Sequence, residues 1–120
     1  MGYEISTVRV FSASHQLRLN DGSMEPLHGH NWKVKVTVSA ERLDAMGVVM
    51  DFHLLEKLVD GVVGPMHNRH LNELRMFEEV NPSAEGVAMR VAEGVKVPTE
   101  VRLVSVEVWE TEENSAVYRP

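Results

Sequence analysis

The sequence contains no cysteine, and this absence excludes several kinds of scaffold and site. A disulfide-stapled fold, a thiolate metal site and a cysteine nucleophile are all impossible without a thiol. Aromatic residues make up only 6% of the chain, and no apolar run approaches the roughly 20 residues of a membrane span. Any metal ligand or nucleophile in this chain is therefore a group other than a thiol.

What is present is typical of a small acidic domain. The 120 residues, 43% of them hydrophobic, are enough to bury a core. A net charge of -6 argues against nucleic acid or an anionic membrane as a partner. The first residues, Met1–Ile5, lack the basic and apolar regions of a signal peptide. We therefore expect one cytoplasmic domain over residues 1–120, with no nucleic-acid or membrane partner.

Four segments have the β-branched or alternating residues that are typical of strands. They are residues 3–13, 32–38, 101–109 and 116–118. In the second segment, valines alternate with Lys33, Lys35 and Thr37, which predicts one buried face and one wet face. The turn signal Asn20-Asp21-Gly22 separates the first two segments and favours their antiparallel pairing.

Two helices are predicted between these strands. The first covers residues 52–63, with Asp51 as its N-cap and Gly64-Pro65 at its end. The second is expected to begin at Asn81-Pro82, with asparagine as the cap and proline in the first helical position. The order β-β-α-α-β-β favours an α+β fold with the helices on one face of the sheet.

The densest chemistry is His28-Gly29-His30, which directly precedes the alternating strand. Residues two apart on a strand share a face, so both imidazoles project together. His15 ends the first strand and returns close to them if the two strands pair. Three neutral imidazoles with one open position describe a catalytic zinc site. The alternative is a chance His-x-His pair, and His53 is expected to be an exposed bystander.

Several motifs occur in an order that is specific as a set: FSASH at 11–15, LHGHNW at 27–32, VMDF at 49–52, LN at 71–72, NPSAE at 81–85 and WET at 109–111. This chain resembles the 6-pyruvoyltetrahydropterin synthase and 6-carboxytetrahydropterin synthase family from about Tyr3 to Tyr118. The resemblance implies a tunnelling fold (T-fold), a four-stranded antiparallel sheet with two helices on one face. It also implies a homotrimer or stacked hexamer, and zinc held by His15, His28 and His30.

The resemblance further implies that Glu110 anchors a pterin ring, with Thr111 beside it in the same substrate-binding motif. Residue chemistry supports the first role independently. Glu110 continues the apolar face of Val106 and Val108, and a carboxylate can accept two N–H groups from an amino-pyrimidinone edge. The alternative is a solvated carboxylate in an acidic run.

The sequence departs from the family pattern at the usual catalytic cysteine, where Met24 stands. A thioether cannot act as a base. The neighbouring Glu25 gives Glu-x-x-His-Gly-His, which resembles the branch in which glutamate replaces cysteine and the substrate side chain is cut. We therefore expect Glu25 to be the base for retro-aldol cleavage. The alternative is one loop carboxylate among 18 acidic residues.

A second departure affects the expected proton relay. The family usually has Asp-His-x-x-Leu-Asn, and here His67 and Asn68 stand at the first two positions. Asn68 cannot transfer a proton at neutral pH. His67 or His70 is therefore a candidate acid without the usual partner. Altered or lost chemistry, or a plain loop role for both histidines, are the alternatives.

These residues together predict a zinc-dependent lyase acting on 7,8-dihydroneopterin triphosphate and yielding 6-hydroxymethyl-7,8-dihydropterin. The alternatives within the family are 6-carboxy-5,6,7,8-tetrahydropterin synthase and 6-pyruvoyltetrahydropterin synthase activity. Met24 and Asn68 favour an alternative of another class, a zinc-containing pterin- or purine-binding module without turnover. A structural oligomer without metal is a further possibility. In a homo-oligomer, sites at subunit interfaces are expected.

Overall fold

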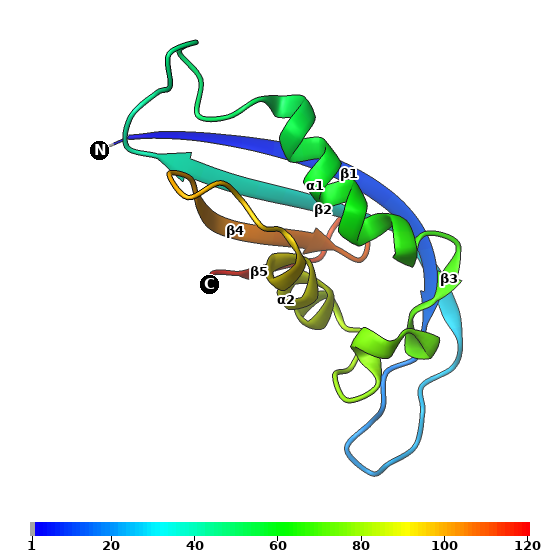
Figure 1. Cartoon of the computed structure of the whole chain (residues 1–120). Coiled ribbons are helices and arrows are strands. Elements are labelled where there is room, and N and C mark those ends of the chain that lie inside the picture. The colour runs from blue at the N-terminus through cyan, green and yellow to red at the C-terminus, as the bar shows by residue number, and fades with distance from the viewer. Residues whose placement is uncertain (1) are drawn as a thin grey trace.

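The computed structural model describes residues 2–120 as one curved sheet with both α-helices on the same face (Figure 1). The strands are β1 (Tyr3–His15), β2 (His28–Ala40), β3 (Arg69–His70), β4 (Arg102–Trp109) and β5 (Ser115–Tyr118), in the spatial order β3-β1-β2-β4-β5. The four longer strands pair antiparallel, as predicted. The sequence did not predict β3, which adds a parallel edge to β1, because two residues are too few to show an alternating pattern.

The helices are α1 (Phe52–Val63) and α2 (Ala84–Gly94). The first begins as predicted, because the backbone N–H of His53 donates to the Asp51 carboxylate at 3.1 Å. The predicted start of the second helix was wrong. Ser83 caps it by accepting from the N–H of Gly86 at 3.0 Å, whereas the Asn81 side chain binds the backbone of Arg18. Three short 3-10 turns, Gly64–Met66, Leu71–Glu73 and Arg75–Phe77, connect the helices.

The core lies between the sheet and the two helices, on what we call the covered face. Alternate residues of β1 and β2 point into it, and the rings of Phe11 and Trp32 stack with their centroids 5.9 Å apart. The register places His15 opposite His28 at the end of this pair of strands. The covered face therefore ends in imidazoles where its apolar side chains stop.

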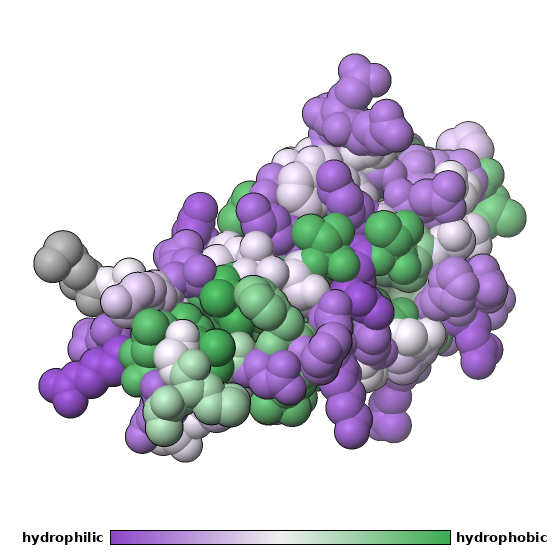
Figure 2. Space-filling model, turned by 90° about the horizontal axis from the view of Figure 1, so that it is seen from above, coloured by the Kyte–Doolittle hydropathy of each residue, from purple (hydrophilic) through white to green (hydrophobic). Residues whose placement is uncertain are grey.

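The other side of the sheet, the open face, carries polar residues and has no helix against it (Figure 1). Val8 and Val10 of β1 are exposed there. Large apolar side chains are also exposed around the loop before α1 and on the first turn of that helix, namely Leu43, Met46, Phe52 and Leu54. Seen from above, apolar side chains gather in patches between hydrophilic ones (Figure 2).

No helix within residues 2–120 is both long enough and apolar enough to cross a membrane.

Candidate metal centre and active site

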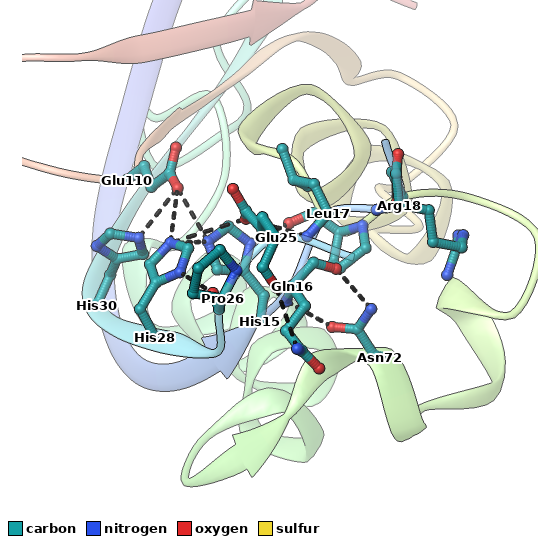
Figure 3. A network of polar contacts seen from close by, with 12 residues as sticks. His15, Gln16, Leu17, Arg18, Glu25, Pro26, His28, His30, Asn72 and Glu110 are labelled. Atoms are coloured by element: carbon teal, nitrogen blue, oxygen red, sulfur yellow. Dashed lines mark hydrogen bonds and ion pairs between the residues drawn. The ribbon is translucent and has the colours of Figure 1, made fainter. Parts of the chain in front are cut away.

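Three imidazoles and one carboxylate converge at the end of the covered face (Figure 3). His15 comes from the end of β1, His28 and His30 from the start of β2, and Glu110 directly follows β4. The Nε2 atoms of His15 and His28 lie 3.0 Å apart. Oε1 of Glu110 lies 3.0 Å from the Nε2 atoms of both His15 and His30, and 4.0 Å from that of His28. We call these four residues the His–Glu cluster.

Two backbone carbonyls fix the orientation of two of these rings. Nδ1 of His15 lies 2.7 Å from the carbonyl oxygen of Pro82, and Nδ1 of His28 lies 2.8 Å from that of Pro26. A carbonyl oxygen only accepts, so we assign the proton of each ring to Nδ1. Each Nε2 then presents a lone pair to the other at 3.0 Å, an arrangement that repels unless a cation lies between them.

The third imidazole supports the same interpretation. Nε2 of His30 is buried without a hydrogen-bond partner, and its contact with Glu110 lacks hydrogen-bond geometry. Burial lowers the pKa of His30, although the nearby Glu110 carboxylate opposes this shift. A neutral imidazole is the form that binds a metal. Three nitrogens and one oxygen are a ligand set that zinc accepts, and tetrahedral ligands at its bond lengths lie roughly 3.3 Å apart. The cluster therefore fits a metal ion.

Glu25 lies at the edge of this cluster and is held there by backbone groups (Figure 3). The N–H of Leu17 donates to its Oε1 at 3.0 Å, and the Glu25 N–H donates to the Leu17 carbonyl at 3.0 Å. The same Oε1 is 3.9 Å from Nε2 of His28. Met24, where the family usually has its cysteine, is an exposed side chain. A fixed carboxylate thus stands next to the cluster.

Two asparagine side chains hold the segment that positions Glu25, a role that was not predicted. Asn72 accepts from the N–H of Gln16 at 2.9 Å and donates to its carbonyl at 2.7 Å. Asn81 binds the N–H and carbonyl of Arg18 in the same way, at 2.8 and 2.9 Å. Both pairs join residues more than fifty positions apart, so only the LN and NPSAE motifs could have drawn attention to them.

His70 lies on the open face of the sheet, and His67 lies at the outer edge of β1. Ser12 and Ser14 alternate with Ala13 and His15 along β1 and so point to the open face. Nδ1 of His67 accepts from the N–H of Ser12 at 3.1 Å, and Nδ1 of His70 is 2.9 Å from Oγ of Ser14. Ser12, Ser14, Asn31, Asn68, Arg69 and His70 line an open groove of about 510 Å³ there. The groove lining also includes His30 of the cluster, but within residues 2–120 no hydrogen bond or ion pair joins His67 or His70 to the cluster.

The backbone conformation at position 68 favours asparagine. Its φ is 59°, in the left-handed region that asparagine adopts more readily than most residues. In this conformation its N–H donates to the Ser12 carbonyl at 2.6 Å and brings β3 alongside β1.

The remaining candidates lie at the surface. Thr111 is exposed in the turn after β4, where its hydroxyl accepts from the N–H of Glu113 and from Nδ2 of Asn114, both at 3.3 Å. His53 is 90% exposed and contacts Glu56 on α1 at 3.1 Å. His53 is thus the exposed residue that the sequence predicted.

The sheet with its two helices and the His–Glu cluster define a small α+β protein with a candidate site for a single metal ion. Residues 4–120 match the family model described as 6-pyruvoyl tetrahydropterin synthase, and the chain belongs to this family. Solved structures with a similar fold include the 6-pyruvoyl tetrahydropterin synthase of Caenorhabditis elegans. It has a TM-score of 0.85 and 24% sequence identity, over 100% of this chain and 96% of that one. The T-fold expected from the resemblance is therefore confirmed.

Curated relatives of similar identity carry different activities. The dihydroneopterin monophosphate aldolase of Pyrococcus furiosus is 35% identical over 105 residues, which cover 86% of this chain and 85% of that protein. The human 6-pyruvoyl tetrahydrobiopterin synthase is 34% identical over 125 residues, covering 91% and 86% respectively. The family is thus one of pterin-converting enzymes, and identity alone does not select one reaction.

Proposed function

We propose that this protein is a zinc-dependent lyase that cuts the side chain of a phosphorylated 7,8-dihydroneopterin to give 6-hydroxymethyl-7,8-dihydropterin. The observation that carries this proposal is the placement of Glu25. Its carboxylate is tethered by the Leu17 N–H and lies 3.9 Å from Nε2 of His28. A base of the required kind thus stands beside the candidate metal site in a chain that has no cysteine. The aldolase named among the relatives supports the same reaction class.

His15, His28 and His30 are the residues that would hold the zinc. When bound, zinc supplies Lewis-acid chemistry, which makes a hydroxyl of the substrate side chain easier to deprotonate. Glu25 takes the proton from the 2′-hydroxyl of that side chain. The C1′–C2′ bond then breaks and C2′ becomes the aldehyde carbon of the departing fragment. The electron pair of the broken bond forms a C1′=C6 double bond, while the π pair of C6=N5 moves to N5. A proton returned to C1′ completes 6-hydroxymethyl-7,8-dihydropterin, without an oxidant or reductant.

Glu110 is proposed to recognise the amino-pyrimidinone edge of the pterin, with Thr111 close by in the same turn. The family resemblance suggests the triphosphate as substrate, whereas the name of the aldolase relative specifies a monophosphate. Both esters have the 1′,2′-diol that retro-aldol cleavage requires. The number of phosphates is therefore a question for the substrate assay.

The direct test is to incubate the zinc-loaded protein with dihydroneopterin monophosphate or triphosphate and to identify the products by mass. We expect 6-hydroxymethyl-7,8-dihydropterin together with glycolaldehyde phosphate or its triphosphate counterpart. A 6-carboxy or 6-pyruvoyl product would instead favour one of the family's synthase activities. Tight pterin binding with no product over a long incubation would favour a binding module. Asn68, which stands where the family has its relay histidine, is the observation that keeps this last candidate open.

We further propose that the protein works as a homo-oligomer, a trimer or stacked hexamer, with active sites at subunit interfaces. β1 pairs with β3 over only two residues, so much of its outer edge is unpaired within residues 2–120, and Val8 and Val10 are exposed beside it. Within residues 2–120 neither His67 nor His70 bonds to its own cluster, and His70 points to the open face with Ser14. We therefore infer that a neighbouring chain supplies the proton donor for each site.

Mixing two inactive variants tests this interface proposal. His28→Ala is expected to lack the metal site, and the double variant H67Q/H70Q to lack the proton donor. Co-refolding the two should form mixed oligomers in which some sites are intact, and activity should return. If light scattering shows a monomer, or if mixing restores no activity, the interface proposal is wrong.

A further inference from the structure

The position of Glu110 differs from the one that pterin anchoring requires. A carboxylate that accepts two N–H groups of a pterin needs both oxygens free. Here Oε1 lies 3.0 Å from the Nε2 atoms of His15 and His30. The side chain is only 31% exposed and points into the ring of imidazoles (Figure 3). This oxygen therefore lies among the candidate ligand atoms of the cluster.

The contacts of Glu110 allow its side chain to leave this position. Within residues 2–120 no hydrogen bond from a backbone N–H, hydroxyl or amide holds its carboxylate, whereas Leu17 fixes that of Glu25 at 3.0 Å. The main chain of Glu110 is anchored by its own N–H, which donates to the Asn114 carbonyl at 3.2 Å. Rotation about side-chain bonds can thus move the carboxylate while the β4–β5 ladder stays in place.

We propose that the Glu110 carboxylate is the fourth metal ligand in the substrate-free protein, and that an arriving pterin draws it away and so opens the coordination position. The identity of the arriving ligand rests on the proposed function, but the resting ligand set does not. Neutral imidazoles leave the full 2+ charge of the ion, and a carboxylate reduces it to 1+. The same carboxylate thereby blocks water and stray anions at the ion until a pterin competes for it. Binding of the pterin and opening of the fourth coordination position of the metal therefore occur together.

Cobalt(II) is the probe for this proposal, because its visible absorption reports the coordination of the bound ion. The proteins to compare are wild type, Glu110→Gln, and the control Glu112→Gln, which removes an exposed carboxylate from the same turn. We expect Glu110→Gln to bind cobalt(II) at least about 10-fold more weakly and with altered bands. Glu112→Gln should match the wild type in both respects.

The second arm adds 2-amino-4-oxopteridine, which has no side chain to cleave or to coordinate through a hydroxyl. We expect its addition to change the cobalt bands of the wild type and of Glu112→Gln, but not those of Glu110→Gln. The proposal is overturned if Glu110→Gln has wild-type cobalt affinity and bands. It is also overturned if the pteridine leaves the wild-type bands unchanged at every concentration tested. Neither readout depends on turnover, so failure of the lyase assay and failure of this proposal are distinguishable.

Discussion

Two groups of histidines lie near the same end of β1, one on the covered face and one along its outer edge and open face, and the fold holds them very differently. On the covered face, His15 is completely buried, its Nδ1 is bonded to Pro82, and its ring meets Trp32 edge-on with centroids 4.9 Å apart. In the second group, His67 directly follows a 3-10 turn at the edge of β1, and His70 ends a two-residue strand and lines an open groove. One group is held as a candidate ligand set, and the other is the proposed source of the proton donor for a neighbouring chain.

The difference teaches that this chain alone can arrange a set of candidate metal ligands, whereas the proposed proton donor lacks any bond to that set within residues 2–120. Ligand atoms must be held rigidly and oriented by further hydrogen bonds, which the core and the two proline carbonyls provide. A proton donor has only to reach the substrate, so it can come from an exposed segment of another chain. Each of the following substitutions tests one side of this comparison.

The largest effect is expected for His28→Ala on the covered face. The His28 side chain is 38% exposed, so its removal leaves no core cavity, in contrast to His15. Zinc affinity should fall by more than about 100-fold, because the loss of a ligand exceeds the 10- to 100-fold cost of losing an outer-shell partner. Elemental analysis after dialysis measures this, with His53→Ala as the control and circular dichroism to verify folding. Full zinc occupancy in His28→Ala would mean that the ion is held elsewhere.

Glu25→Gln should reduce kcat by about 10²- to 10⁴-fold, the usual contribution of a general base. The amide keeps the hydrogen bond from Leu17, so the loop and the zinc content should be unchanged. Steady-state kinetics at matched zinc content give the result, and Glu73→Gln, an exposed carboxylate on a 3-10 turn, is the control. An undiminished rate would show that the base is another group.

On the open face, His70→Gln should lower kcat by roughly 10²-fold if this residue donates the proton. Zinc content and the metal-site spectrum should stay as in the wild type, because His70 contacts Ser14 and not the cluster. The same measurement on His67→Gln distinguishes the two candidates. If both variants keep full activity, the open face has no part in the reaction.

The smallest effect is expected for Asn72→Ala, which leaves the N–H and carbonyl of Gln16 without their partners. Two lost hydrogen bonds in a half-buried segment should lower the free energy of unfolding by about 1–3 kcal/mol. Urea denaturation measures this, and Asn20→Ala in the exposed turn is the control. Wild-type stability in Asn72→Ala would show that the amide does not hold this segment.

Local sequence patterns predicted the features of the site that depend on which face of a strand a residue occupies and on which strands pair. The alternation along β2 placed His28 and His30 on one face, and antiparallel pairing brought His15 opposite His28. Contacts between distant segments were not predictable in this way. The bonds of Asn72 and Asn81 to the Gln16–Arg18 segment, and the carbonyl of Pro82 on His15, join residues more than fifty positions apart.

Glu110 shows both what the sequence pattern could predict and what it could not. Its phase with Val106 and Val108 correctly predicted that it continues the covered face at the end of β4. Its approach to within 3.0 Å of two imidazoles depends on the packing of β4 against β2 and on the turn that follows it. A periodic pattern gives a side chain its face, but not its distance from a neighbouring strand.

The most direct test of the covered-face cluster as a catalytic metal centre is a zinc titration of chelator-stripped protein, with product formation from dihydroneopterin monophosphate followed by mass. The stripped protein should be inactive. Release of 6-hydroxymethyl-7,8-dihydropterin should rise linearly with added zinc and reach a plateau at one zinc per chain. Equal product formation before and after zinc is restored would contradict a catalytic role for the metal, and a plateau far from one zinc per chain would contradict this single site.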